Sequence, residues 1–208
     1  MGTQDTRQRL LDAAEELFAA GGYANTSLRA ITAGAKANIA AVNYHFGSKE
    51  ALMDAVLQRR LLPLNRLRRQ RLEEVMGAAR DAGQRPAARD LVRAFVEPTL
   101  VFRGAGTRSF IALISRALSD PEPTVRTGFL RLITPLLEYF CQCLAEALPH
   151  LSRPELFWRF HFLMGALAHV MHGLDKEDLF PAEMMPADPS ALVDMLVNFL
   201  VAGMEAKS

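Results

Sequence analysis

Apolar residues recur at spacings of three and four along almost the whole chain of 208 residues. This is the period of one face of an α-helix, whereas alternating β-branched runs bounded by turn residues are nearly absent. The pattern therefore predicts an all-α protein. Half of the residues are hydrophobic, which is enough to bury a core in one large domain or two small ones and excludes disordered, collagen-like and small disulfide-rich proteins.

Glycine, proline and capping residues divide this pattern into separate helices. Gly21-Gly22 and Gly34 end the first two, and Gly47-Ser48 separates the third from the fourth. Ser152 to Glu155 fits a capping box, and Asp188 caps the last helix. The expected helices cover about residues 6–20, 27–34, 38–44, 48 to beyond 62, 87–103, 107–119, 123–148, 153–173 and 190–204.

The fourth helix contains a proline and a cluster of arginines. Pro63 should kink it, because proline lacks an amide donor and its ring crowds the preceding turn. The basic segment 65–72 that follows is typical of a solvated helix face. Residues 77–86, rich in glycine, alanine and charge, form the expected linker.

The chain has two cysteines, Cys141 and Cys143, and their one-residue gap fits neither a zinc site nor a redox pair. We expect two buried thiols. The polar, acidic N-terminus lacks the pattern of a signal peptide, which predicts a cytoplasmic protein. Residues 156–174 carry one formal charge over a length that can span a bilayer. Because they also contain three histidines, we expect a buried helix and no membrane partner.

Residues 26–52 have the layout of a helix-turn-helix, in which the second of two short helices enters the DNA major groove. Thr26 is positioned to cap the first short helix, with its hydroxyl accepting a free amide, and Asn38 to cap the second. The apolar positions of the motif predict its core, which comprises Leu28, Ile31, Val42, Phe46 and Leu52.

These residues resemble the TetR family of bacterial transcriptional regulators. The resemblance covers about residues 6–60 and is carried by Thr26-Ser27-Leu28-Arg29-Ala30-Ile31-Thr32 and by the run Tyr44-His45-Phe46-x-x-Lys49-x-x-Leu52. It implies a DNA-binding domain over 1–50, a connecting helix and linker over 51–85, and a helical ligand-binding and dimerisation domain over 86–208. It also implies a homodimer on a pseudo-palindromic operator of double-stranded DNA.

The residues of the motif also have a direct physical interpretation. Small alanines let the backbone approach a base, and Asn43 can donate to a base edge or a phosphate. Hydroxyls at a helix N-terminus and a lysine favour phosphate oxygens, which position the module. The predicted DNA-binding residues are Thr26, Ser27, Arg29, Asn38, Ala40, Ala41, Asn43, Tyr44, His45 and Lys49.

Lys36 departs from the family pattern, which usually has glycine in the turn between the two short helices. A left-handed backbone there costs a non-glycine residue on the order of 1 kcal/mol. Either the turn is strained at Lys36 or Gly34 adopts the left-handed conformation in place of Lys36.

The two parts of the chain differ in charge. Residues 1–85 hold 13 basic and 9 acidic residues, whereas residues 86–208 hold 11 basic and 14 acidic residues. Within residues 1–60, however, there are only 7 basic residues against 6 acidic ones, so DNA affinity must depend on a few well-placed groups and on two-fold symmetry.

The last two long helices are apolar over a wider face than one core contact needs, which indicates a second contact with a partner subunit. In the helix from residue 152, one apolar stripe lies beside another that includes Phe157 and Met164. The predicted dimer interface comprises Leu156, Phe160, Leu163, Leu167, Val170, Leu192, Leu196, Phe199 and Leu200.

The run from Leu156 to Ala166 is similar to a sub-branch of the family that responds to fatty acids or their acyl thioesters. This resemblance implies a hydrophobic small-molecule effector that releases a repressor from its operator. Arg103, Arg116 or Arg159 can hold an anionic head group, although surface positions are the simpler interpretation. The predicted ligand-binding residues are Phe102, Phe110, Ile114, Phe140, Trp158, His161 and Phe162.

No combination of residues typical of catalysis is present, so we expect neither an enzyme nor a cofactor. His169 and His172 are spaced to chelate a metal, but no carboxylate or cysteine pair accompanies them, so we expect no metal site. The alternative hypothesis is a helical lipid-binding protein without a DNA function, and the salt dependence of DNA binding distinguishes the two.

Overall fold

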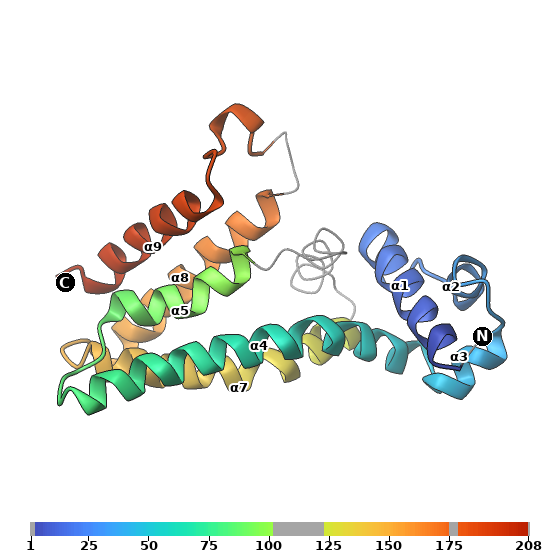
Figure 1. Ribbon diagram of the computed structural model, residues 1–208, viewed down its shortest axis with the longest axis horizontal. Helices are drawn as coiled ribbons and strands as arrows, with labels where there is room; N and C mark the ends of the chain where they lie inside the picture. The colour runs from blue at the N-terminus through green and yellow to red at the C-terminus, as the bar shows by residue number, and fades with distance from the viewer. Residues whose placement is uncertain (1–2, 102–122, 175–178, 208) are drawn as a thin grey trace. The chain divides into compact units, whose positions relative to one another are not determined.

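The computed structural model describes residues 3–101, 123–174 and 179–207, and every regular element within these ranges is a helix (Figure 1). The prediction of an all-α protein is confirmed. The expected helix over 107–119 lies outside the described residues. The elements are α1 (Thr3–Gly21), α2 (Leu28–Gly34), α3 (Ile39–His45), α4 (Lys49–Asp81), α5 (Ala88–Val101), α7 (Pro123–Ala147), α8 (Arg153–Gly173), η1 (Ala182–Met184) and α9 (Pro189–Glu205).

The chain divides into two compact units. Unit 1 comprises residues 1–63 and 104–133, and unit 2 comprises residues 64–103 and 134–208. The helices α4 and α7 each contribute residues to both units. The boundaries at residues 50 and 85 stay a prediction.

In unit 1, the helices α1, α2 and α3 pack against one another in pairs. Leu10, Phe18, Ile31, Val42 and Leu52 are fully buried, and their spacing is the helical period on which the fold prediction depends. Two members of the predicted core are less enclosed, because Leu28 and Phe46 are only partly buried.

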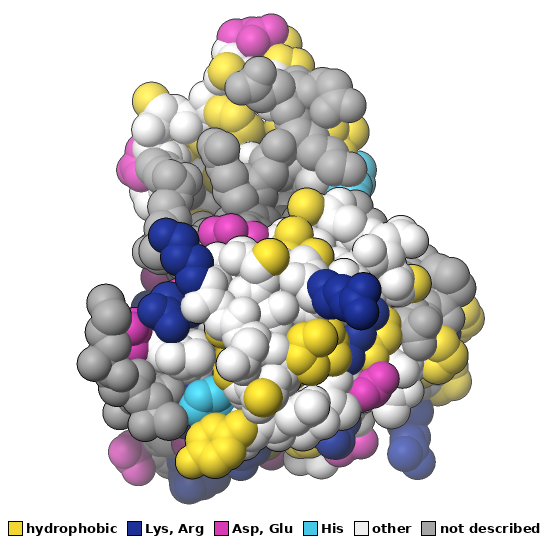
Figure 2. Space-filling model, turned by 90° about the vertical axis from the view of Figure 1, so that its right-hand side faces the viewer, with side chains coloured by type: hydrophobic (Ala, Val, Ile, Leu, Met, Phe, Trp, Pro, Cys, Tyr) yellow, Lys and Arg dark blue, Asp and Glu magenta, His cyan; other side chains and the backbone are white. Residues whose placement is uncertain are grey.

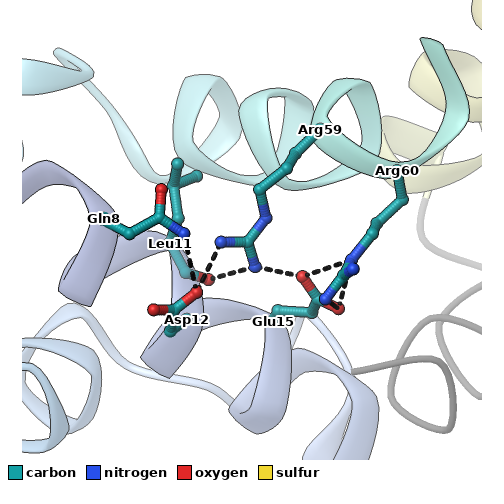
Figure 3. A network of polar contacts seen from close by, with 6 residues as sticks. All are labelled: Gln8, Leu11, Asp12, Glu15, Arg59 and Arg60. Atoms are coloured by element: carbon teal, nitrogen blue, oxygen red, sulfur yellow. Dashed lines mark hydrogen bonds and ion pairs between the residues drawn. The ribbon is translucent and has the colours of Figure 1, made fainter. Parts of the chain in front are cut away.

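An ion-pair network joins α1 to α4 within unit 1 (Figure 3). Glu15, 2% exposed, contacts Arg59, and its Oε1 lies 2.8 Å from Nη2 of Arg60. Asp12 adds a second acceptor for Arg59, with 2.6 Å between Oδ1 and Nη1. Because Glu15 is buried and both of its partners are charged, removal of its carboxylate would leave Arg60 without its described carboxylate partner and Arg59 with Asp12 alone.

The helix α4 is longer than the sequence pattern predicts. It continues through Pro63 and past Gly77 to Asp81, so the linker expected over 77–86 is wrong at its N-terminal end. Only residues 82–87 connect α4 to α5, and Gly83 turns the chain with φ of +64°. The solvated face expected over 65–72 is also interrupted, because Arg68 is 5% exposed.

In unit 2, α9 packs against both α5 and α8. A row of aromatic rings forms part of the core: Phe95 stacks on Phe140 at a centroid distance of 4.3 Å, and the ring centroids of Phe140 and Phe160 are 5.8 Å apart.

Two predicted helix caps in unit 2 are confirmed. Ser152 and Glu155 form the capping box of α8, and Asp188 caps α9. No described helix, the one over 156–174 included, is long and apolar enough to cross a membrane.

Candidate nucleic-acid interface and dimer face

Ser27 caps α2, so the prediction that Thr26 does so is wrong. Oγ of Ser27 accepts a hydrogen bond from the amide of Ala30 at 3.1 Å. The Thr26 side chain is instead buried, and its hydroxyl lies 2.7 Å from the carbonyl oxygen of Gly22. Because this buried hydroxyl donates to a carbonyl oxygen just after the end of α1, the structure does not present it to a phosphate.

The helix α3 presents a small, exposed face with one buried anchor. Oδ1 of Asn38 accepts from the amide of Ala41 at 2.9 Å, which confirms the predicted cap. Val42 is fully buried and fixes the rotation of the helix. As a result Ala40 and Asn43 are exposed, and Tyr44 is 77% exposed. Such a face of small, amide and aromatic groups suits contact with base edges and phosphates.

The turn between α2 and α3 is strained at Lys36. Its φ is +49°, in the left-handed region that favours glycine, whereas Gly34 stays in α2. Of the two alternatives that the sequence leaves open, strain at Lys36 is therefore the correct one. The exposed Lys36 side chain adds a positive charge two residues before Asn38, the cap of α3.

Lys49 supports the connection between α1 and α2. Its Nζ donates to the carbonyl oxygen of Tyr23 at 2.7 Å and lies 4.2 Å from the centroid of the Tyr23 ring. The Tyr23 hydroxyl donates to Glu50 at 2.8 Å. The pKa of Glu50 is lowered, first by a backbone amide and then by this hydroxyl. A phosphate contact by Lys49 stays a prediction, since the lysine also has this structural role.

Apart from Lys49, the Lys and Arg side chains up to residue 63 fall into two groups. Arg59 and Arg60 form ion pairs with carboxylates, as does Arg9. Among described residues, Arg7, Arg29 and Lys36 have no carboxylate partner, and all three are exposed. Figure 2 shows the face of the molecule that includes α1, α2 and α3. The basic side chains on this face are scattered and do not form one patch. Only a few cations are therefore free to meet phosphates.

Two exposed residues of this face, Arg7 and Ile39, are not among the predicted DNA-binding residues. The guanidinium of Arg7 lies 5.2 Å from the ring of Phe46, at the end of α3. Ile39, the first residue of α3, is 42% exposed although it is apolar. An apolar residue directly after a cap residue was the available signal, because a side chain there can contact a thymine methyl group.

Most of the residues predicted for the dimer interface are buried within the single chain, so the structure does not expose them to a partner subunit. Val170 and Leu192 are half-buried and only Phe199, at 70%, is well exposed. The other six are buried within the single chain; they are Leu156, Phe160, Leu163, Leu167, Leu196 and Leu200.

A different set of apolar residues is exposed on these two helices, and we call it the aromatic face. On α8, Phe157, Trp158 and Phe162 are 51%, 58% and 68% exposed, and on α9 Met195 is 62% exposed. Phe199 completes the set. The rings on α8 contact one another, with 6.2 Å between the centroids of Trp158 and Phe162. Exposed aromatic rings so close together on α8 indicate an interaction surface.

The four predicted ligand-binding residues that the structure describes do not form one site. Phe102, Phe110 and Ile114 lie outside the described residues. Phe140 is in the core, whereas Trp158, His161 and Phe162 are exposed on α8. Two grooves, of about 780 Å³ between α4 and α5 and about 570 Å³ between the starts of α4 and α7, are rimmed by charged residues and include none of these candidates.

Of the arginines suggested for an anionic head group, Arg103 and Arg116 lie outside the described residues. Arg159 caps α9 instead: its Nη1 donates to the carbonyl oxygens of Met204 at 2.8 Å and Ala206 at 2.7 Å. This contact satisfies carbonyl groups that a helix C-terminus leaves without partners.

Comparison with known proteins gives matches in both halves of the chain. The family model described as bacterial regulatory proteins, tetR family, matches residues 10–56. The model of the tetracyclin repressor-like C-terminal domain matches residues 93–203. An HTH-type transcriptional repressor of Mycobacterium tuberculosis is 42% identical over 66 residues, which are 32% of this chain and 35% of that protein. The match thus spans about a third of the length of this relative.

Solved structures show the same fold at low identity. The fatty acid degradation regulator FadR of Bacillus halodurans has a TM-score of 0.72 at 15% identity, covering 97% of both chains. FadR of Bacillus subtilis, in complex with stearoyl-CoA, has a TM-score of 0.69 at 16% identity, covering 94% of this chain and 98% of that one. A TetR-like regulator of Rhodococcus has a TM-score of 0.63 at 22% identity, covering 97% of both.

Proposed function

This chain belongs to the TetR family of bacterial transcriptional regulators, and we propose that it is a homodimeric repressor that a hydrophobic effector releases from its operator. The observation that carries the proposal is the capped pair α2 and α3, with Asn43 and Tyr44 exposed and Val42 buried beneath them. We place this activity in the cytoplasm, where the bacterial chromosome lies.

Repression is the favoured sign of regulation. A repressor is among the relatives at 42% identity, and the matched 66 residues exceed the length of the helix-turn-helix itself. A bound repressor needs only to occupy its operator, and the groups that we propose for this contact are the exposed face of α3 and the exposed cations Arg7, Arg29 and Lys36.

The dimer supplies the two-fold symmetry that such an operator needs. We assign the contact to the aromatic face, because it exposes five large apolar side chains on two helices that pack together. Aromatic residues and methionine are enriched where protein interfaces are fully buried. A two-fold axis through this face would bring the same residues of both subunits together.

A fatty acid or an acyl thioester is the effector class that we propose. The support is the fold similarity to two FadR proteins, one of them in complex with stearoyl-CoA. An effector of this kind acts by binding better to the conformation that does not fit the operator, which shifts the population away from DNA.

Selection from random duplexes tests the proposal without knowledge of the operator. The purified chain should enrich an inverted repeat, and stearate or stearoyl-CoA should release the protein from it. Failure to enrich any sequence would favour the helical lipid-binding protein instead. Enrichment of a non-repeated site would contradict the dimer.

Lys36 provides a test in which stability and DNA affinity change in opposite directions. Replacement of Lys36 by glycine relieves the positive φ and should raise the free energy of unfolding by on the order of 1 kcal/mol. It also removes one cation per subunit, so the slope of log K against log salt should fall by about 2 for the dimer. Urea unfolding and a salt series of operator titrations measure the two effects. An unchanged slope would exclude a phosphate contact by Lys36.

A further inference from the structure

Arg68 is a buried cation without a carboxylate partner among the described residues. It lies in the part of α4 that belongs to unit 2, is 5% exposed, and has Leu64 and Leu72 one turn away on either side, both fully buried. Burial of an unpaired charge is costly, and native proteins normally place a carboxylate beside a buried guanidinium.

The neighbouring carboxylates on α4 and α5 have other partners. Glu73 pairs with Arg69 at 2.8 Å, and Glu97 pairs with Arg71 at 2.9 Å. The Arg68 guanidinium instead meets neutral groups. Its Nε donates to Oγ1 of Thr99 at 3.1 Å, and Nη2 contacts the same oxygen.

The remaining contact of Arg68 is an aromatic ring. Its Cζ lies 4.4 Å from the centroid of Phe95, a cation–π distance, and Phe95 begins the row of rings that includes Phe140. Burial alone lowers the pKa of Arg68 to about 9. No described residue accepts a hydrogen bond from Nη1, so the edge of the guanidinium formed by Nη1 and Nη2 has capacity left for an acceptor.

We propose that Arg68 binds the carboxylate of an apolar effector acid inside unit 2, an inference that rests on the effector-controlled regulator proposed above. A carboxylate fits a guanidinium edge with two parallel hydrogen bonds. One buried cation compensates one negative charge, which favours a free acid over a thioester of coenzyme A with its several phosphates. The neighbours of Arg68, which include Leu64, Leu72 and Phe95, are apolar, as is the remainder of such an acid.

The test uses the full chain, freed of bound lipid, with decanoate, decanol and decanoyl-CoA as probes in calorimetric titrations. Decanoate should bind best. Arg68→Met, which keeps the length of the side chain but removes its charge, should weaken decanoate binding at least about thirtyfold. Arg66→Met, at an exposed arginine two residues earlier, should leave it unchanged.

Three results would overturn the assignment: no decanoate binding by the wild-type chain, equal binding of decanol or decanoyl-CoA, or unchanged decanoate binding in Arg68→Met. The ligand-free Arg68→Met protein should also unfold at no lower temperature than the wild type, since it lacks the uncompensated charge. A lower unfolding temperature would be a fourth result against the assignment, because it would show that Arg68 is structural. Without ligand, the wild-type chain and Arg68→Met should bind the operator with the same affinity. A failure of the repressor function would therefore appear as lost operator binding, separately from a failure to bind decanoate.

Discussion

Replacement of Glu15 by alanine is expected to lower the free energy of unfolding of unit 1 by about 3 kcal/mol. The Glu15 side chain is 2% exposed and contacts both Arg59 and Arg60. Its removal leaves two largely enclosed guanidinium groups without their shared carboxylate. We choose the lower end of the range for broken buried ion pairs because the arginine side chains are 19% and 18% exposed and Asp12 still pairs with Arg59.

Hydrogen exchange of the α1 amides measures this effect directly, because the network joins α1 to α4. In Glu15→Ala, exchange of the α1 amides should accelerate by about two orders of magnitude. Glu16→Ala is the matched control, since Glu16 is the next residue of the same helix and is exposed. Equal exchange in the two variants would show that the network does not stabilise unit 1.

Replacement of Phe162 by aspartate is expected to convert the dimer into a monomer. Phe162 is 68% exposed and contacts Trp158 on the aromatic face. A carboxylate buried against the same face of a second subunit would be unpaired, so the dissociation constant of the dimer should rise at least about a hundredfold. Because the side chain is exposed in the single chain, stability of the monomer should change by no more than about 0.5 kcal/mol.

Sedimentation velocity at several concentrations measures the change in Phe162→Asp. The control is Met184→Asp, which places the same charge at a residue that is 77% exposed in η1, outside the aromatic face. It should remain a dimer. A wild-type chain that is monomeric at micromolar concentration, or a Phe162→Asp protein that still dimerises, would contradict the assignment of the interface.

Local sequence signals predicted the helices and most of their caps. Asn38, Ser152 and Asp188 were identified because a short polar side chain must accept an amide two or three residues later. The same reasoning predicted Thr26 as the cap of α2, and this prediction is wrong. Either Thr26 or Ser27 can cap α2, and the choice depends on the carbonyl of Gly22, which draws the threonine hydroxyl into the core.

The sequence could not show which apolar stripe of α8 faces inward. Both stripes repeat at the helical period, and only packing against the rest of unit 2 buries Phe160 and exposes Phe162. Arg68 is a similar case. Within a run of arginines it has no distinguishing sequence feature, and its burial follows from Thr99 and Phe95 on α5.

The central claim is that α3 reads DNA sequence as part of a dimer. The most direct test is a titration of the selected operator duplex and of a scrambled duplex at several salt concentrations. The wild-type chain should prefer the operator by about three orders of magnitude or more, and its affinity should fall as salt rises. Asn43→Ala should lose at least about tenfold in operator affinity, whereas Gln142→Ala, at an exposed amide of α7, should lose none. Equal affinity for the two duplexes, or unchanged binding by Asn43→Ala, would contradict the claim.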